Sequence, residues 1–159
     1  MSSFPLRELR RDDAEQVAAL FQRTFADARP IDAEEIRSWL DNEDLKPEWL
    51  RVLEVDGRIV GYGDIYVDEK GLPLDVAAPG YWDVFIDWAE DEARTRGIPE
   101  VRLFFPHGHE LGREAQRRGY SHWRSSFRME IDLDDPARPQ PPDGIAVRPY
   151  AGAAFARPG

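Results

Sequence analysis

The segment from Leu72 to Phe105 constrains the fold most, because it predicts a strand, a tight turn, a helix and a second strand in close succession. Apolar residues alternate at its start, and Pro79-Gly80 interrupts the alternation. From Trp82 to Arg96 the apolar side chains recur with a helical period, and Gly97 suits the left-handed end of that helix. The run 101–105 predicts a buried strand. A strand that enters a helix through a glycine turn directs backbone N–H groups at whatever lies above the turn, so the turn can bind an anion.

The composition indicates one globular core and argues against several functions. With 159 residues, 42% of them apolar and 11% aromatic, the chain can build a single well-packed core. A net charge of −10 argues against a nucleic-acid surface, which would need a basic stripe. The chain has neither a long apolar run typical of a membrane span nor the pattern of a signal peptide. It also lacks cysteine, and we expect a cytoplasmic protein without disulfides.

The first third of the chain predicts a short strand and two helices. The strand is expected at Phe4–Leu9, and either Asp12 or Asp13 is expected to cap the helix that follows. Asp32 precedes Glu35 by three residues, which is the spacing of a capping box. We therefore expect a second, short helix to begin after Asp32.

A hairpin, a helix and a long strand are predicted in the rest of the chain. Asp56-Gly57 separates the apolar runs 50–55 and 58–67 and is the strongest hairpin signal in the sequence. His109–Arg118 predicts a short helix that ends at a glycine. From Trp123 to Leu133 apolar and polar residues alternate, which predicts a long strand with one solvated face.

A proline-rich stretch divides the chain. Four prolines lie within residues 134–143, which predicts a stiff linker between domains. The sequence after it, Ile145–Tyr150, repeats the apolar–Arg step of Phe4–Leu9. We therefore expect a first domain, a linker and the first strand of a second copy of the domain, at residues 1–133, 134–143 and 144–159.

The order of these elements resembles the GCN5-related N-acetyltransferase (GNAT) family. The resemblance is carried by Val52–Tyr62, Asp87–Gly97 and Arg117–Tyr120, and it spans most of residues 4–133. The sequence that joins the linker to Ile145–Tyr150 is similar to bacterial proteins with two such domains in tandem. The resemblance implies an α/β (α+β) fold, with a mixed central sheet flanked by helices and a splay between the fourth and fifth strands.

The same resemblance implies a function. Members of the family transfer an acetyl group from acetyl-CoA to a primary amine, which attacks the thioester directly in a ternary complex. The acceptor is then a small molecule or a peptide, and a second GNAT domain or a homodimer is the expected protein partner. The positions that match the family's cofactor loop are Val76, Ala77, Ala78, Gly80, Tyr81 and Trp82.

The cofactor loop departs from the family's pattern, Arg/Gln-x-x-Gly-x-Gly/Ala. Its three marked positions fall on Ala77, Gly80 and Trp82, so only the first glycine matches. Between Gly71 and Ala93 there are six acidic residues and no lysine or arginine, and acidic residues repel a pyrophosphate. A compensating charge would have to come from the next helix, which carries Arg113, Arg117 and Arg118.

Asp64 and Asp75 are the best-placed candidates for the catalytic base, and the alternative is that both are solvated strand residues. The tyrosine that often serves as the family's proton donor is replaced by Ala115, and Tyr120 is expected to pack against the sheet. His107-Gly108-His109 lacks a clear third ligand, and we predict no metal site there.

Three functions remain open at this point. The chain is an acetyl-CoA-dependent N-acetyltransferase, or a catalytically inactive lobe of the same fold that serves an active partner domain. The third option is a module that binds a different ligand in the cleft.

Overall fold

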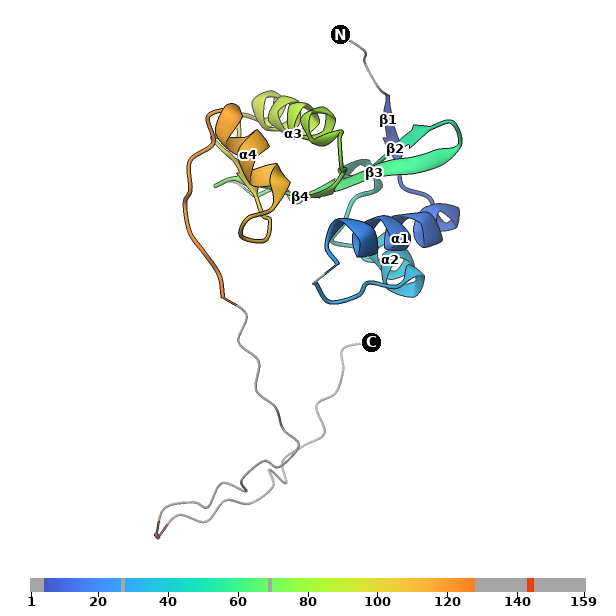
Figure 1. The fold of residues 1–159 in the computed structure, drawn as a ribbon, viewed down its shortest axis with the longest axis horizontal. Coiled ribbons are helices and arrows are strands. Elements are labelled where there is room, and N and C mark those ends of the chain that lie inside the picture. Colours follow the sequence, from blue (N-terminus) through green and yellow to red (C-terminus); the bar gives the residue numbers. More distant parts are fainter. Residues whose placement is uncertain (1–4, 27, 69, 128–142, 145–159) are drawn as a thin grey trace. The chain divides into compact units, whose positions relative to one another are not determined.

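The computed structural model describes residues 5–26, 28–68, 70–127 and 143–144. The chain divides into two units, Met1–His122 and Trp123–Gly159. All the helices and strands of the described residues lie in the first unit (Figure 1). Five strands form its sheet: β1 (Leu6–Glu8), β2 (Leu50–Val55), β3 (Arg58–Ile65), β4 (Leu72–Ala77) and β5 (Val101–Leu103).

The strands lie in the order in which they occur along the chain, β1-β2-β3-β4-β5. The first four pair antiparallel, and β4 pairs with β5 in parallel, so the sheet is mixed. A parallel pair needs a crossover, and α3 (Trp82–Arg96) supplies it. The mixed α/β fold that the sequence predicts is therefore confirmed.

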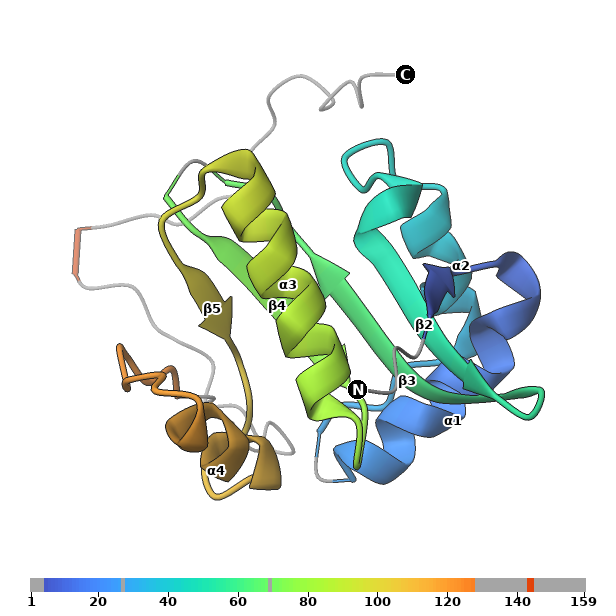
Figure 2. The same cartoon turned by 90° about the horizontal axis from the view of Figure 1, so that it is seen from above.

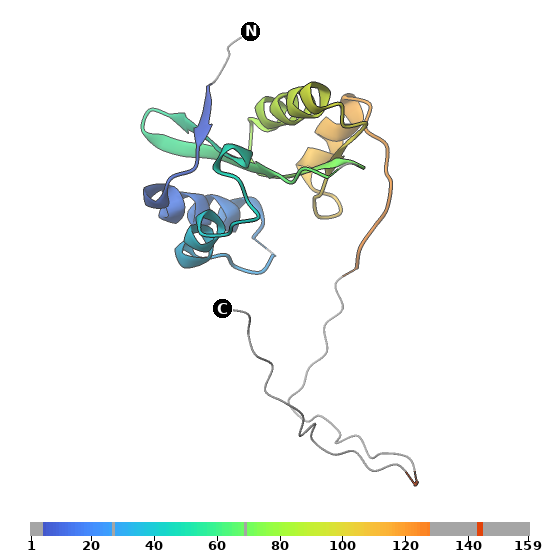
Figure 3. The same cartoon turned by 180° about the vertical axis from the view of Figure 1, so that it is seen from behind.

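Helices cover both faces of the sheet. On one face lie α1 (Ala14–Thr24) and α2 (Ala33–Leu40), and α3 lies on the other; α4 (Glu110–Arg117) lies beside α3, beyond the end of β5, as Figures 2 and 3 show. Two short 3₁₀ turns, η1 (Arg11–Asp13) and η2 (Pro47–Trp49), precede α1 and β2. Each face has its own buried core, because successive side chains of a strand point to opposite sides.

A phenylalanine of α3 lies directly on two glycines of β3. A Cβ atom on Gly61 or Gly63 would come within 2.5 Å of the Phe85 ring, and Phe85 is fully buried. These glycines, which weaken a strand by themselves, leave room for a close neighbour. On the opposite face of β3, Tyr62 and Asp64 are turned toward α1 and α2.

Several local predictions are confirmed. The Asp32 carboxylate accepts a hydrogen bond from the Glu35 backbone N–H at 2.8 Å and caps α2. Asp56 and Gly57 both have positive φ, 51° and 75°, as a two-residue hairpin turn of type I′ requires. Gly97 ends α3 in the left-handed conformation with φ 68°.

The capping role of Asp13 is a correction. Asp13 occupies the N-cap position of α1, but its side chain makes no cap hydrogen bond there. Its carboxylate instead accepts two hydrogen bonds from the Arg7 guanidinium, at 2.7 and 2.8 Å, and one from the Arg10 backbone N–H. A bidentate charged pair is stronger than a neutral cap contact, so the carboxylate points back toward β1.

Two strand predictions also need correction. β5 ends at Leu103 and is half-buried, and Phe104 and Phe105 are exposed. In the predicted strand 123–133, residues 123–127 form no strand, and the rest lies outside the described residues. Alternation gives a segment the capacity to pair, but a strand forms only where a neighbouring strand satisfies its backbone groups. The linker at 134–143 also falls almost wholly outside the described residues, so the predicted domain boundaries stay predictions.

Candidate functional site

The fourth and fifth strands separate after three residues. β4 pairs with β5 from Leu72 to Leu74, opposite Val101 to Leu103. β4 then continues through Asp75 to Ala77, and over this stretch the described residues give it no partner on the β5 side. The predicted splay between these strands is confirmed. It leaves the end of β4 open toward two pockets, one on each side of the sheet.

The first pocket, called the aromatic pocket here, lies on the side of α1 and α2 and has a volume of about 360 Å³. Its walls are apolar and come from the first third of the chain: Phe21, Phe25, Ile31, Trp39, Leu45 and Leu50. Its floor is formed by β3 and β4 through Tyr62, Asp64, Asp75 and Val76, with Phe104 beside the splay.

The two candidate bases lie opposite each other on this floor. Asp64 of β3 and Asp75 of β4 are direct partners in the antiparallel register, an arrangement that is unfavourable when both are charged. Asp64 is half-buried, and Asp75 is open to the mouth of the pocket. Burial and the nearby Asp75 carboxylate raise the pKa of Asp64 to about 7, and the partial desolvation of Asp75 raises its pKa in the same direction although the residue is exposed at the mouth.

Tyr62 contributes a buried hydroxyl to the same floor. Its side chain is fully buried, and among the described residues its hydroxyl oxygen has no hydrogen-bond partner. Burial raises the pKa of this hydroxyl well above its usual value, and the nearby Asp64 carboxylate adds to the effect. The hydroxyl is therefore neutral near pH 7, and it lies close enough to Asp64 to lower the pKa of that carboxyl in turn.

The second pocket, called the helix pocket here, lies between the start of α3 and the helix α4 and has a volume of about 290 Å³. It is lined by Gly80, Trp82, Glu110, Arg113, Glu114 and Arg117. Gly80 has a φ of 80°, and no atom lies within 4 Å of the place where a Cβ would be. The backbone of this turn, which the sequence predicts to bind an anion, is therefore accessible to a ligand.

Trp82 forms part of a wall between the two pockets. Its indole N–H donates to the Glu110 carboxylate at 3.0 Å, and its ring meets the His109 ring edge to face at 5.5 Å. The other neighbour of His109 is Phe25, at 5.1 Å between ring centroids. Phe25 lines the aromatic pocket and Trp82 lines the helix pocket, so these three rings connect the two sides of the sheet beyond the end of β4.

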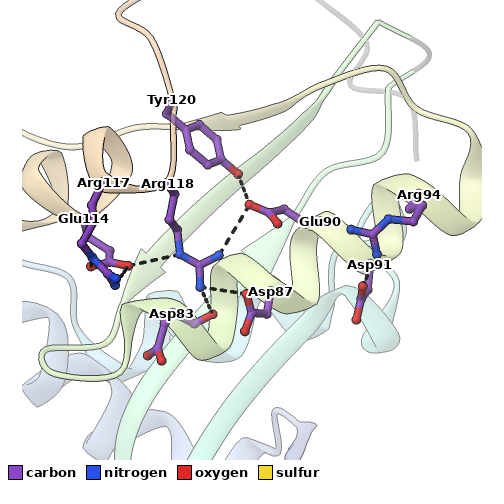
Figure 4. A network of polar contacts seen from close by, with 9 residues as sticks. All are labelled: Asp83, Asp87, Glu90, Asp91, Arg94, Glu114, Arg117, Arg118 and Tyr120. Carbon is purple, nitrogen blue, oxygen red and sulfur yellow. Dashed lines mark hydrogen bonds and ion pairs between the residues drawn. The ribbon is translucent and has the colours of Figure 1, made fainter. Parts of the chain in front are cut away.

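Two of the three candidate arginines, Arg117 and Arg118 at the end of α4, are bound to carboxylates (Figure 4). The Arg118 guanidinium contacts Asp87 at 2.8 Å, Glu114 at 3.1 Å and Glu90 at 3.6 Å. Arg117 pairs with Glu114 at 2.6 Å. Arg113 lines the helix pocket, and no described residue forms an ion pair or hydrogen bond with its side chain. Of the three arginines that could compensate the acidic residues, Arg113 is therefore the one left for a ligand.

The remaining candidates have structural contacts. Tyr120 packs against the core on the α3 side of the sheet, as predicted, and its hydroxyl donates to Glu90 at 3.0 Å (Figure 4). His109 is the N-cap of α4, where its Nδ1 atom accepts a hydrogen bond from the Leu111 backbone N–H. Among the described residues no three His, Cys, Asp or Glu side chains gather as a metal site would require.

The predicted site residues divide between the two pockets. Asp64, Asp75 and Val76 line the aromatic pocket, while Gly80 and Trp82 line the helix pocket. Ala77 and Ala78 are fully buried at the end of β4, and Tyr81 is the N-cap of α3. The sequence analysis did not identify the aromatic walls of the aromatic pocket or Glu110 of the helix pocket. Phe21 and Phe25 belong to the apolar stripe of α1, and this stripe gave no sign of which of its residues would line a pocket.

Comparison with known proteins identifies the fold. A ribosomal-protein-alanine N-acetyltransferase from Brucella melitensis biovar Abortus 2308 superposes with a TM-score of 0.60 at 20% identity, covering 80% of this chain and 99% of that chain. The fold is that of the GNAT acetyltransferases. The aminoglycoside N-acetyltransferase AAC(6')-Iy in complex with CoA gives a TM-score of 0.54 at 16% identity, covering 80% of this chain and all of that chain.

A protein with the same fold is described as a transcriptional regulator instead of an acetyltransferase. A transcriptional regulator from Bacillus halodurans C-125 gives a TM-score of 0.62 at 15% identity, covering 80% of this chain and 99% of that chain. No family model and no curated protein matches the sequence. None of the helices among the described residues of this chain is long and apolar enough to span a membrane. At such identities the likeness establishes the fold, and the activity must be argued from the site.

The helix pocket offers backbone N–H groups that could bind the phosphates of acetyl-CoA, but its charged side chains suit phosphates only in part. No side chain among the described residues caps α3, and the turn at Gly80 is open. The Val84 N–H donates to the Tyr81 carbonyl at 3.2 Å, so the Trp82 and Asp83 N–H groups are the first-turn donors without a partner among the described residues. Arg113 adds one unpaired positive charge. Glu110 and Glu114 oppose it, and Glu114 stays ionised because its contacts with Arg117 and Arg118 lower its pKa. The backbone would hold a phosphate group that the carboxylates repel.

Proposed function

We propose that this domain transfers an acetyl group from acetyl-CoA to the nitrogen of a primary amine bound in the aromatic pocket. The observation that supports it most is the place of the Asp64–Asp75 pair, on the pocket floor directly beside the splay. In the proposal the turn at Gly80, the first turn of α3 and Arg113 would hold the phosphates of the donor. When bound there, acetyl-CoA would supply a thioester that gives its acetyl group to the amine, while the released thiolate takes up a proton.

Asp64 has the role of general base in this proposal. A primary amine is mostly protonated at neutral pH and cannot attack a carbonyl carbon until it loses a proton. A base works best when its pKa lies near the working pH, and burial together with Asp75 raises the pKa of Asp64 to about 7. Asp75, opposite Asp64, would stabilise the ammonium before the proton is removed.

A second candidate function is an inactive lobe that binds an amine without acetylating it. The wall of Trp82, His109 and Phe25 favours this alternative, because it separates the pocket that would hold the donor from the pocket that would hold the acceptor. The hydrogen bond from Trp82 to Glu110 fixes the wall to α4. The two functions differ in one measurable property, which is the affinity for acetyl-CoA.

The decisive experiment measures CoA binding by calorimetry and thiol release in the presence of a panel of primary amines. In Glu110→Gln the amide oxygen still accepts the Trp82 hydrogen bond, but the charge at the helix pocket is removed. Two unit charges about 4 Å apart interact by about 1 to 4 kcal/mol between water and a protein surface, so we expect the variant to bind CoA about tenfold more tightly.

Glu48→Gln is the matched control, because Glu48 is exposed in η2 and lies outside the residues that line the helix pocket. We expect its affinity for CoA to equal that of the unmodified chain. If neither the unmodified chain nor Glu110→Gln binds CoA at millimolar concentration, the acetyltransferase proposal fails, and the inactive lobe and the module that binds a different ligand remain.

A further inference from the structure

We infer that the aromatic pocket selects an organic ammonium ion with a single charge on a compact apolar or aromatic body, and that it discriminates against hydroxyl-rich amines. The ammonium group lies at the Asp64–Asp75 pair, and the apolar body lies among Phe21, Trp39 and Tyr62. The inference names the acceptor class of the proposed function and in that sense rests on it. It follows from three features of the pocket.

The first feature is a pair of carboxylates without a counter-ion. None of the described residues that line the pocket is basic, and no ion pair or hydrogen bond to a described lysine or arginine engages Asp64 or Asp75. In the rest of the unit acidic side chains such as Asp13, Glu35 and Glu114 are paired with arginines. Two like charges directly opposite in a sheet destabilise it, and a bound cation between them removes that cost.

The second feature is a set of aromatic rings in mutual contact. The Phe21 ring lies 5.4 Å from the Tyr62 ring and 6.0 Å from the Trp39 ring, and Trp39 lies 5.7 Å from Tyr62. Phe21 and Trp39 are only half-buried, so their faces are available to a ligand. Aromatic faces attract cations as well as apolar groups, which makes this wall suited to an ammonium ion on an apolar body.

The third feature is the small number of polar groups. The buried Tyr62 hydroxyl has no partner among the described residues, and it lines the pocket beside the two carboxylates. Apart from the Trp39 indole N–H and this enclosed hydroxyl, the two carboxylates are the polar side-chain groups among the residues that line the pocket, and they can accept the hydrogen bonds of one ammonium group. A ligand with many hydroxyl groups would give up hydrogen bonds to water that the walls cannot replace, so such ligands are disfavoured.

The volume of the pocket agrees with a small ligand. At about 360 Å³ it lies at the lower end of the range of ligand pockets, roughly 300 to 1,000 Å³. An ammonium ion with one aromatic ring fits this description, and an oligosaccharide does not.

The test is calorimetric titration of the full chain, without acetyl-CoA, with four probes: 2-phenylethylamine, 2-phenylethanol, ethylamine and glucosamine. The alcohol has the ring without the charge, ethylamine has the charge without the ring, and glucosamine has the charge on a hydroxyl-rich body. We expect 2-phenylethylamine to bind at least about tenfold more tightly than each of the others. Equal affinity for the amine and the alcohol, or tighter binding of glucosamine, would overturn the inference.

Variants separate the two parts of the pocket. Asp64→Asn with Asp75→Asn should abolish the preference for the amine over the alcohol, and Trp39→Leu should weaken both ligands by a similar factor. Asp56→Asn is the matched control, because it removes one carboxylate at the hairpin turn, far from the residues that line the pocket, and asparagine tolerates the positive φ of 51° there. A preference that survives in the double variant would contradict the assigned role of the carboxylates.

The outcomes for this inference and for the proposed function are independent. Tight binding of 2-phenylethylamine without any release of CoA thiol supports the pocket assignment and rejects acetyl transfer. Release of thiol with glucosamine but not with 2-phenylethylamine supports acetyl transfer and rejects the pocket assignment.

Discussion

The two pockets at the end of β4 have similar sizes and the same number of carboxylates, yet they differ in how those carboxylates are bound. In the helix pocket Glu110 accepts the Trp82 indole N–H, and Glu114 is held by Arg117 and Arg118. In the aromatic pocket Asp64 and Asp75 have no basic partner among the residues that line it. In the helix pocket Glu110 joins α4 to α3 and Glu114 is held by the end of its own helix, whereas the carboxylates of the aromatic pocket are left for a ligand.

The comparison shows why a count of acidic residues near a cleft does not indicate its function. The segment from Gly71 to Ala93 contains six acidic residues, of which only Asp75 lines the aromatic pocket. Asp87 and Glu90 hold Arg118, and Asp91 pairs with Arg94 (Figure 4). A charge indicates a binding site when its surroundings leave it unpaired, and this depends on contacts between distant parts of the chain.

The largest expected effect is a loss of stability, which should differ between a core residue and a residue of the pocket wall. Phe85→Ala removes a fully buried ring that lies against Gly61 and Gly63, and we expect the free energy of unfolding to fall by about 3 to 5 kcal/mol. Phe21→Ala removes a half-buried ring of the aromatic pocket and should cost about 1 to 2 kcal/mol. Urea denaturation measures both. Equal losses would mean that the aromatic wall is ordinary core.

An intermediate effect is expected at α4. The Arg118 side chain is 18% exposed and contacts three carboxylates, so Arg118→Ala should lower the free energy of unfolding by about 1 to 3 kcal/mol. Arg117→Ala is the control on the same helix, because the Arg117 side chain is 70% exposed and its pair with Glu114 should contribute less than about 1 kcal/mol. Similar losses for both variants would show that the contacts of Arg118 do not hold α4 against α3.

The features of the fold that could be predicted depend on neighbours in sequence. The bounds of α3, the turn at Asp56-Gly57 and the cap at Asp32 follow from patterns a few residues long. The splay was predicted through the resemblance to a family, and not from the residues alone. In the predicted strand 123–133, residues 123–127 form no strand, since an alternating pattern gives no information on a partner strand; the rest lies outside the described residues.

The site was harder to predict because its contacts join distant residues. Trp82 and Glu110 are separated by 28 positions, and Phe25, His109 and Trp82 come from three different elements. Three arginines on α4 looked equivalent in the sequence. The orientation of the helix decides that Arg118 is bound to α3 while Arg113 lines the helix pocket. Asp64 and Asp75 were identified singly, and only the strand register brings them together.

The smallest expected effect tests the unpaired carboxylates through the pH dependence of stability. Because burial and Asp75 raise the pKa of Asp64 to about 7, the folded chain holds this proton at pH values where the unfolded chain, with a pKa near about 3.9, has lost it. The stability that comes from the protonated group is complete below pH about 4 and is lost as the pH rises through about 7. Ionisation of Asp64 therefore favours the unfolded chain.

Asp64→Asn cannot ionise, so it should match the unmodified chain in melting temperature near pH 4 and exceed it by about 2 to 4 °C near pH 8, the shift that about 1 kcal/mol produces in a chain of this size. Asp56→Asn, at the exposed hairpin turn, should show no such dependence on pH. A melting temperature of Asp64→Asn below that of the unmodified chain near pH 8 would mean that the carboxylate is stabilised in the fold. The contrast between the two pockets would then disappear, because the charges of both would serve the structure.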